Sequence, residues 1–171
     1  MKYRIYGLLV SALMCFTSMA QEFSARKGGN CFTMDIPDYF TRTFELNDNA
    51  SLQYRNTSRV AFVIVIEDDK SQLESMGIKF VNAKDFLESF SNDFKKDFPG
   101  RKQLNPKEFT HNGNKYAQVE FYWTEEGSDF YMLITGVETP GHFYKIMCWT
   151  SLENKPKNND DFLRISKSLR E

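Results

Sequence analysis

One run of residues constrains the fold of this chain more than any other feature. Residues 60–66 read Val-Ala-Phe-Val-Ile-Val-Ile, so apolar side chains fall at both odd and even positions. Successive side chains of a strand point to opposite faces of the sheet, and β-branched residues favour strands. The run therefore predicts a strand inside a sheet that is covered on both faces. A hairpin partner is expected at 51–55, across a turn at 56–58.

Helices able to cover such a sheet are predicted from apolar spacing. Four phenylalanines recur at every fourth position, as on one face of a helix: Phe86, Phe90, Phe94 and Phe98. Asn82 is a suitable N-cap, and the Pro-Gly pair at 99–100 suits the end of the helix. The aromatic stripe could line a binding groove, but packing of the helix on a sheet is the favoured interpretation.

The second half of the chain predicts a meander of strands followed by a closing helix. Turn signals at 112–113, 125–128 and 140–141 separate four strands between 109 and 150. A helix capped by Asn159 or Asp160 would then bury Phe162, Ile165 and Leu169 on one face. We expect an α+β fold in which an antiparallel sheet is sandwiched between helices. The alternative places both helices on one face, as in cystatin-like and NTF2-like folds.

The first 20 residues have the pattern of a secretory signal. Lys2 and Arg4 precede an apolar run from 5 to 16, and small residues lead to a predicted cleavage site between Ala20 and Gln21. The run is shorter than the roughly 20 residues that cross a bilayer. We expect an exported protein, periplasmic or extracellular in a bacterium, with a single domain at 21–171. Lipid modification of Cys15 is disfavoured, because the preceding Met14 is not small.

The charge of the chain argues against nucleic-acid binding. Lys and Arg number 22 against 23 Asp and Glu, a net charge of −1, and the basic pairs are separated by acidic and apolar residues. No later stretch is long and apolar enough to span a membrane. We expect an envelope protein or glycan as the partner, no nucleic acid, and no transmembrane segment after signal cleavage.

The mature chain has two cysteines, Cys31 and Cys148, which could form a disulfide in an oxidising compartment. Their predicted strand faces favour two free thiols instead, with Cys148 on an apolar face. Cys148 beside His142 is conceivable as a thiol–imidazole pair, although a core cysteine and a surface histidine are the simpler interpretation.

Neither a metal site nor a catalytic site has support in the sequence. The two histidines, His111 and His142, lack a paired-ligand spacing, and the sequence has no nucleophile elbow or zinc-protease motif. The acidic run at 67–69 does not follow a calcium-loop pattern, and a solvated strand end explains it better. We predict no catalytic residue, no metal ligand and no cofactor.

The order of elements resembles the PsbP-like fold family. The resemblance rests on an opening Phe-x-Met-x-Ile-Pro-x-x-Phe at 32–40, the hairpin ending at 60–67, the helix at 83–98, the meander at 108–150 and the closing helix ending at 165–169. The family includes extrinsic photosystem II subunits, a nuclear import factor and exported bacterial proteins of the DcrB type. The resemblance implies a binding or assembly role without chemistry, and it carries over no functional residue.

A partner surface is predicted on one face of the strand at 116–124. Tyr116, Gln118 and Tyr122 share this face, and Tyr131 is expected beside them. Exposed aromatics next to hydrogen-bonding groups suit protein or glycan contact. The alternative is that a helix covers the strip. We expect an exported, non-enzymatic envelope domain that binds or stabilises a partner, and alternatively a small ligand-binding protein or enzyme with a pocket between sheet and helix.

Overall fold

The computed structural model describes residues 22–29 and 31–171, so the predicted signal segment and its cleavage site lie outside the described residues. Its main element is an antiparallel sheet of eight strands in the order β3-β4-β5-β10-β9-β8-β6, with β7 also paired to β8. The strands are β3 (Thr41–Arg42), β4 (Leu52–Asn56), β5 (Ala61–Asp69), β6 (Lys102–Gln103), β7 (Lys107–His111), β8 (Asn114–Glu125), β9 (Ser128–Glu138) and β10 (His142–Ser151). Within these described ranges, no helix is long and apolar enough to cross a membrane.

Strand β5 confirms the prediction from its two-sided apolar pattern. It pairs with β4 on one side and with β10 on the other. Val63 and Val65 are buried in the core on one face of the sheet, while Ile64 is buried in the core on the other. Both faces of the strand therefore exclude water, which is why the sequence there lacks alternation.

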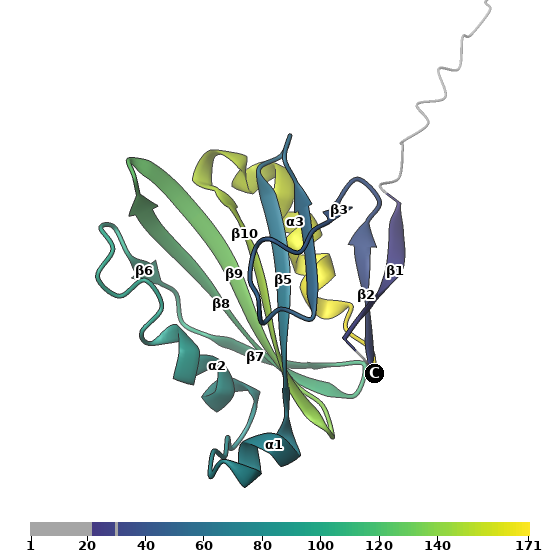
Figure 1. The fold of residues 1–171 in the computed structure, drawn as a ribbon. Helices are drawn as coiled ribbons and strands as arrows, with labels where there is room; N and C mark the ends of the chain where they lie inside the picture. Colours follow the sequence, from purple (N-terminus) through teal and green to yellow (C-terminus); the bar gives the residue numbers. More distant parts are fainter. Residues whose placement is uncertain (1–21, 30) are drawn as a thin grey trace, which may run out of the picture.

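Helix α2 (Ala83–Ser91) covers one face of the sheet and packs on β8, β9 and β10 (Figure 1). Its N-cap is Asn82 as predicted, with Oδ1 accepting hydrogen bonds from the backbone N–H groups of Lys84 and Asp85. The helix is shorter than the phenylalanine spacing indicates. It ends at Ser91, and the guanidinium of Arg101 donates hydrogen bonds to the carbonyl oxygens of Ser91 and Phe94, which satisfies acceptors that the helix no longer pairs.

The opposite face is covered by helix α3 (Lys155–Lys167), which follows a short 3₁₀ helix η1 (Leu152–Asn154). Phe162 and Ile165 are fully buried beneath it, and so is Leu169 just beyond its end. Helices therefore lie on both faces of the sheet, which confirms the sandwich and excludes the one-sided alternative. The helix starts earlier than the predicted cap at 159–160, because Pro156 occupies its first turn, where no N–H is needed.

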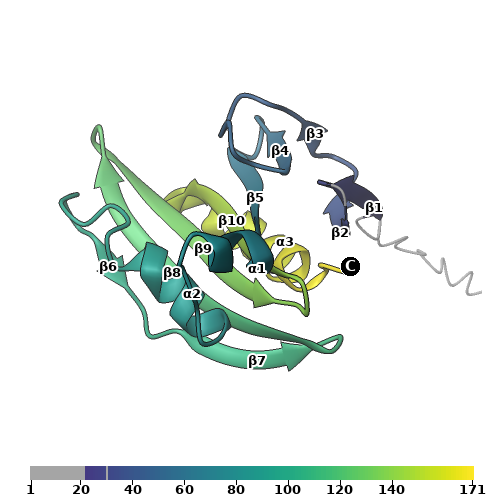
Figure 2. The same cartoon turned by 60° about the horizontal axis from the view of Figure 1, so that its bottom comes forward.

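A strand that the sequence did not predict lies in the polar lead-in. Strand β1 (Phe23–Gly28) pairs with β2 (Phe32–Pro37) in a separate two-stranded sheet, and β2 packs on α3. Figure 2 shows this hairpin beside α3 and β3. Strand β1 is paired on one side only within the described residues, so polar side chains are compatible with its position.

The segment after α3 is fixed to β2. Thr33 and Arg170 exchange two backbone hydrogen bonds of 2.8 and 3.0 Å. The Arg170 guanidinium also binds both carboxylate oxygens of Asp35, at 2.5 and 3.1 Å. The hydrogen bonds from Arg170 lower the pKa of Asp35 below its ordinary value.

This ion pair predicts a pH-dependent stability. At pH 7 the Asp35→Asn variant should lose about 0.5–1 kcal/mol of unfolding free energy, as expected for a well-oriented surface pair. The pKa of Asp35 is lower in the folded than in the unfolded state. The stabilisation by the ion pair is therefore complete when the pH is above the pKa of Asp35 in the unfolded state, about 3.9. It is lost as the pH falls through the lower pKa of Asp35 in the folded state.

Urea unfolding free energies of the parent and of Asp35→Asn should accordingly converge as the pH falls below the folded pKa of Asp35. The same exchange at exposed Asp160 serves as the control and should show no comparable difference at pH 7. A difference for Asp35→Asn that persists unchanged in acid would contradict the ion-pair explanation.

Candidate functional site

The predicted partner strip is not on the surface. Tyr116, Gln118 and Tyr131 are buried, with Gln118 only 8% exposed, and Tyr122 is partly buried. Helix α3 lies over this face, as in the covered alternative. The Gln118 amide donates hydrogen bonds to Thr135 at 2.9 Å and to Ser166 of α3 at 3.0 Å. The predicted exposure of the strip is therefore wrong, because a helix packs on it.

The two described cysteines are free thiols in different environments, so the Cys31–Cys148 disulfide is not formed. Cys148 lies inside the core on β10, and burial raises the pKa of its thiol far above the ordinary value. Cys31 is exposed just before β2 and contacts Tyr144, four positions along β10 from Cys148. The conceivable pair of Cys148 with His142 is also not found, since Cys148 packs in the apolar core.

His142 instead approaches Cys31. The Cys31 thiol donates a hydrogen bond to Glu67 Oε1 at 2.9 Å, and Cys31 Sγ is 3.8 Å from His142 Nε2. His142 Nε2 is 3.7 Å from Glu67 Oε1, so the three functional groups form a small triangle. We call these residues, together with Tyr144 and Glu171, the Cys31 cluster.

The sheet register places the cluster. Glu67 pairs with Tyr144 across β5 and β10, and His142 pairs with Asp69, so all four side chains leave the same face. Cys31 reaches them from the β1–β2 hairpin. Gly29 leaves room for this approach, since a Cβ atom there would collide with Glu67 Oε2, and its φ of +51° suits glycine.

Glu171 fixes the orientation of the histidine. Its Oε1 lies 2.7 Å from His142 Nδ1 and accepts hydrogen bonds from Tyr144 at 2.7 Å and Thr139 at 2.9 Å. Burial alone would raise the pKa of Glu171, but these hydrogen bonds outweigh it and lower the pKa. Because an ionised carboxylate only accepts, Nδ1 carries a proton and Nε2 faces Cys31 and Glu67.

The thiol of Cys31 is not activated as a nucleophile in this arrangement. Desolvation of the sulfur by its neighbours, together with the hydrogen bond to Glu67, raises the pKa of the Cys31 thiol. Reactive cysteines depend on the opposite shift, toward the thiolate. The cluster does offer sulfur, nitrogen and oxygen atoms all within 4.8 Å of one another, which is the composition of a metal site.

Sequence reasoning missed this cluster because its members lie far apart in the chain. No spacing motif links positions 31, 67 and 142, which become neighbours only through the β5–β10 register and the packing of the β1–β2 hairpin. The acidic run at 67–69 is the one sequence feature that points to this cluster, and from the sequence alone it was interpreted as a solvated strand end. The position of Glu67 directly after the apolar run of β5 could not by itself reveal its partners.

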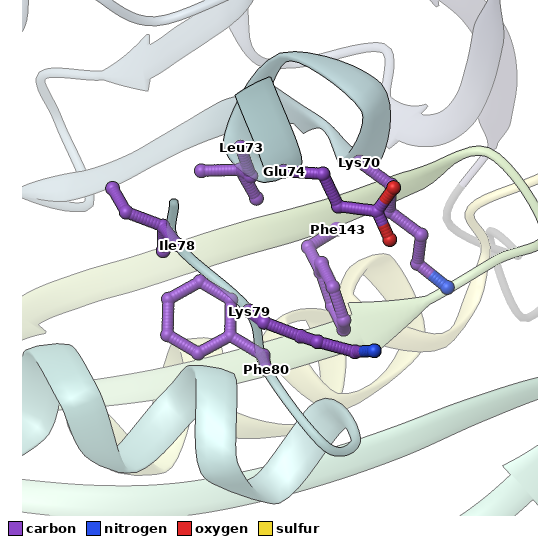
Figure 3. A pocket seen from close by; sticks show the side chains of 7 residues that line it. All are labelled: Lys70, Leu73, Glu74, Ile78, Lys79, Phe80 and Phe143. Atoms are coloured by element: carbon purple, nitrogen blue, oxygen red, sulfur yellow. The ribbon is translucent and has the colours of Figure 1, made fainter. Parts of the chain in front are cut away.

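A second feature lies at the same end of β5, on the opposite face of the sheet. Helix α1 (Lys70–Ser75) follows β5 directly, and Asp69 caps it by accepting from the Gln72 N–H at 2.9 Å. Between α1 and the segment 76–81 is a pocket of about 130 Å³. Figure 3 shows the side chains that line it: Lys70, Leu73, Glu74, Ile78, Lys79, Phe80 and Phe143.

The segment beside this pocket exposes apolar side chains. Met76, Ile78 and Val81 are 63%, 41% and 82% exposed and lie within six residues of one another. The other large apolar side chains exposed in the described ranges, Phe44, Val60 and Leu152, are scattered along the chain. We call the group made by Leu73, Met76, Ile78, Phe80 and Val81 the α1 surface.

Comparisons with known proteins give the fold. Neither a protein-family model nor a curated protein sequence matches the chain. The solution structure of the cyanobacterial PsbP protein CyanoP from Synechocystis sp. PCC 6803 is similar, with a TM-score of 0.60, 14% identity, and coverage of 91% of this chain and 96% of that one. LpqN from Mycobacterium tuberculosis, described as involved in cell envelope biogenesis, also has a TM-score of 0.60, with 11% identity and coverage of 86% and 89%. The chain therefore has a PsbP-like fold, as its order of elements predicted.

Proposed function

We propose that this chain is an exported, non-enzymatic domain of the cell envelope that binds or stabilises a partner protein through its α1 surface. The signal pattern at 1–20 supports export. The fold supports a role without chemistry only as an analogy, since a shared fold does not fix a function. The similarity to LpqN, which is described as an envelope biogenesis protein, supports the same compartment.

The observation that carries the proposal is the concentration of exposed apolar side chains on the α1 surface. Val81 is the most exposed large apolar side chain of the described residues, and Ile78 lies at the rim of the pocket. Isolated exposed apolar residues are ordinary, whereas a contiguous group with a polar rim is typical of an interaction site. Lys70, Glu74 and Lys79 supply that rim (Figure 3).

The pocket fits one apolar anchor of a partner protein. Its volume of about 130 Å³ is close to that of a cavity that holds a benzene ring. Phe80 and Phe143 meet edge to face at 5.6 Å and would contact such an anchor. A glycan is less suitable, because the aromatic strip with hydrogen-bonding groups that would suit a sugar lies under α3.

The alternative of a small enzyme has less support. The reactive group that the sequence made conceivable was a thiol–imidazole pair of Cys148 with His142. Cys148 is instead part of the apolar core, and the thiol that does approach His142 has a raised pKa. The pocket at α1 is lined by lysine, glutamate and apolar side chains, without a histidine, serine or cysteine.

The test is quantitative affinity capture from envelope extracts. An Ile78→Ser/Val81→Ser variant should lose at least about tenfold of the affinity for the captured partner, because apolar anchors at the centre of an interface dominate binding. The control variant Phe44→Ser/Leu152→Ser removes exposed apolar side chains elsewhere and should bind like the parent. Equal retention by both variants would contradict the α1 surface as the binding site.

A further inference from the structure

The three ligand atoms of the Cys31 cluster are spaced as a tetrahedral metal ion requires. A zinc ion bonds sulfur at about 2.3 Å and nitrogen or oxygen at about 2.0 Å, which separates its ligand atoms by about 3.3–3.5 Å. The observed separations are 2.9 Å from Cys31 Sγ to Glu67 Oε1, 3.8 Å from Sγ to His142 Nε2 and 3.7 Å from Nε2 to Oε1. Changing each of these three separations by only about half an ångström gives the separations between ligand atoms of a tetrahedral zinc site.

We propose that Cys31 Sγ, Glu67 Oε1 and His142 Nε2 bind a zinc ion. The thiol proton leaves to solvent as the zinc–sulfur bond forms. The donor set selects the class of metal, because calcium and magnesium take oxygen ligands, whereas zinc takes thiolate, imidazole and carboxylate together. The site does not depend on the proposed function of the α1 surface, which lies on the other face of the sheet.

The surroundings of His142 give an independent reason. A metal-binding histidine normally donates its other ring N–H to a carboxylate or carbonyl, which orients the ring and fixes the tautomer. Glu171 occupies this position, 2.7 Å from His142 Nδ1, and is itself held by Tyr144 and Thr139. His142 Nε2 is thereby turned toward Cys31 and Glu67.

The site is preformed and accessible. Glu67 and His142 come from neighbouring strands whose register is fixed by continuous pairing between β5 and β10. Their side chains are 16% and 20% exposed, and Cys31 is at the surface, so an ion can enter. A fourth position is left for water or for Asp69, whose Oδ2 is 3.6 Å from His142 Nε2.

Cobalt and zinc binding test the site. In a protein whose Cys15 is replaced by serine, Co²⁺ should give tetrahedral visible bands and a thiolate-to-cobalt charge-transfer band at one ion per chain. Zinc should displace the cobalt, and a chromophoric chelator in competition gives the zinc affinity. Cys31→Ser should abolish the charge-transfer band and lower the zinc affinity at least about tenfold.

Two controls separate a metal ligand from a structural residue. Cys148→Ala removes the other described thiol and His111→Ala the other described histidine, and both should keep the cobalt spectrum. Glu171→Gln should weaken zinc by about 10–100-fold while keeping the tetrahedral cobalt bands, because Cys31, Glu67 and His142 all remain. The proposal is overturned if the parent protein gives no tetrahedral cobalt bands and does not take zinc from the chelator. It is also overturned if Cys31→Ser binds cobalt and zinc like the parent.

Discussion

The Phe162→Ala variant should lose about 3–5 kcal/mol of unfolding free energy, one of the two largest effects expected for this domain. Phe162 is fully buried in the core that α3 forms with the sheet and β2. Truncation removes the apolar transfer free energy of the ring and leaves a cavity that the surrounding strands cannot fill. Urea unfolding at pH 7 measures the loss as a lower midpoint with an unchanged slope.

Leu163 is the matched control on the same helix. It is only partly buried, so Leu163→Ala should cost clearly less than Phe162→Ala. Equal losses at the two positions would mean that α3 does not bury the face that contains Phe162. The sandwich architecture would then be wrong on that side of the sheet.

The Gly136→Val variant tests the other side and should cost about 1–3 kcal/mol or more. Gly136 lies on β9 directly beneath α2. A Cβ atom there would approach the Ala83 carbonyl oxygen at 2.8 Å and Leu87 Cβ at 3.2 Å. Valine favours strands in general, so a loss of stability reports the collision with the helix backbone and not a poor strand propensity.

Gly141 provides the comparison, because a Cβ atom there would have no neighbour within 4 Å among the described residues. Gly141→Ala should change the unfolding free energy by no more than about 0.5 kcal/mol. A Gly136→Val variant as stable as Gly141→Ala would show that α2 does not pack closely on β9.

The elements that the sequence predicted well are those set by local patterns. The apolar run at 60–66 identified the covered strand, Asn82 identified the start of α2, and Asn112-Gly113 identified a tight turn in which both residues have positive φ. Strand β1 was missed because a polar edge strand needs only one partner and carries little apolar signal.

The sites were harder to predict, because each depends on contacts between distant segments. Tyr116 and Tyr122 share one face of β8 as predicted, but only the position of α3 decides that this face is covered. The Cys31 cluster depends in the same way on pairing Glu67 with Tyr144 and on the approach of the β1–β2 hairpin. The periodicity of a single sequence shows neither where α3 packs nor which distant segments pair.

The Cys31 cluster and the α1 surface are neighbours across one end of the sheet. Asp69 connects them, because its Oδ1 caps α1 while its Oδ2 lies 3.6 Å from His142 Nε2. Figure 1 shows α1 at the end of β5, where this residue lies. The two features are separable by mutation, since Ile78 and Val81 do not belong to the cluster.

The most direct test of the proposed function is site-specific photo-crosslinking in intact cells. A photoreactive side chain replaces Val81 in one protein and exposed Leu152 in another. The α1 surface predicts one discrete crosslinked partner from position 81 and none from position 152. Crosslinking patterns that are the same at both positions, or no crosslink at position 81, would contradict the account.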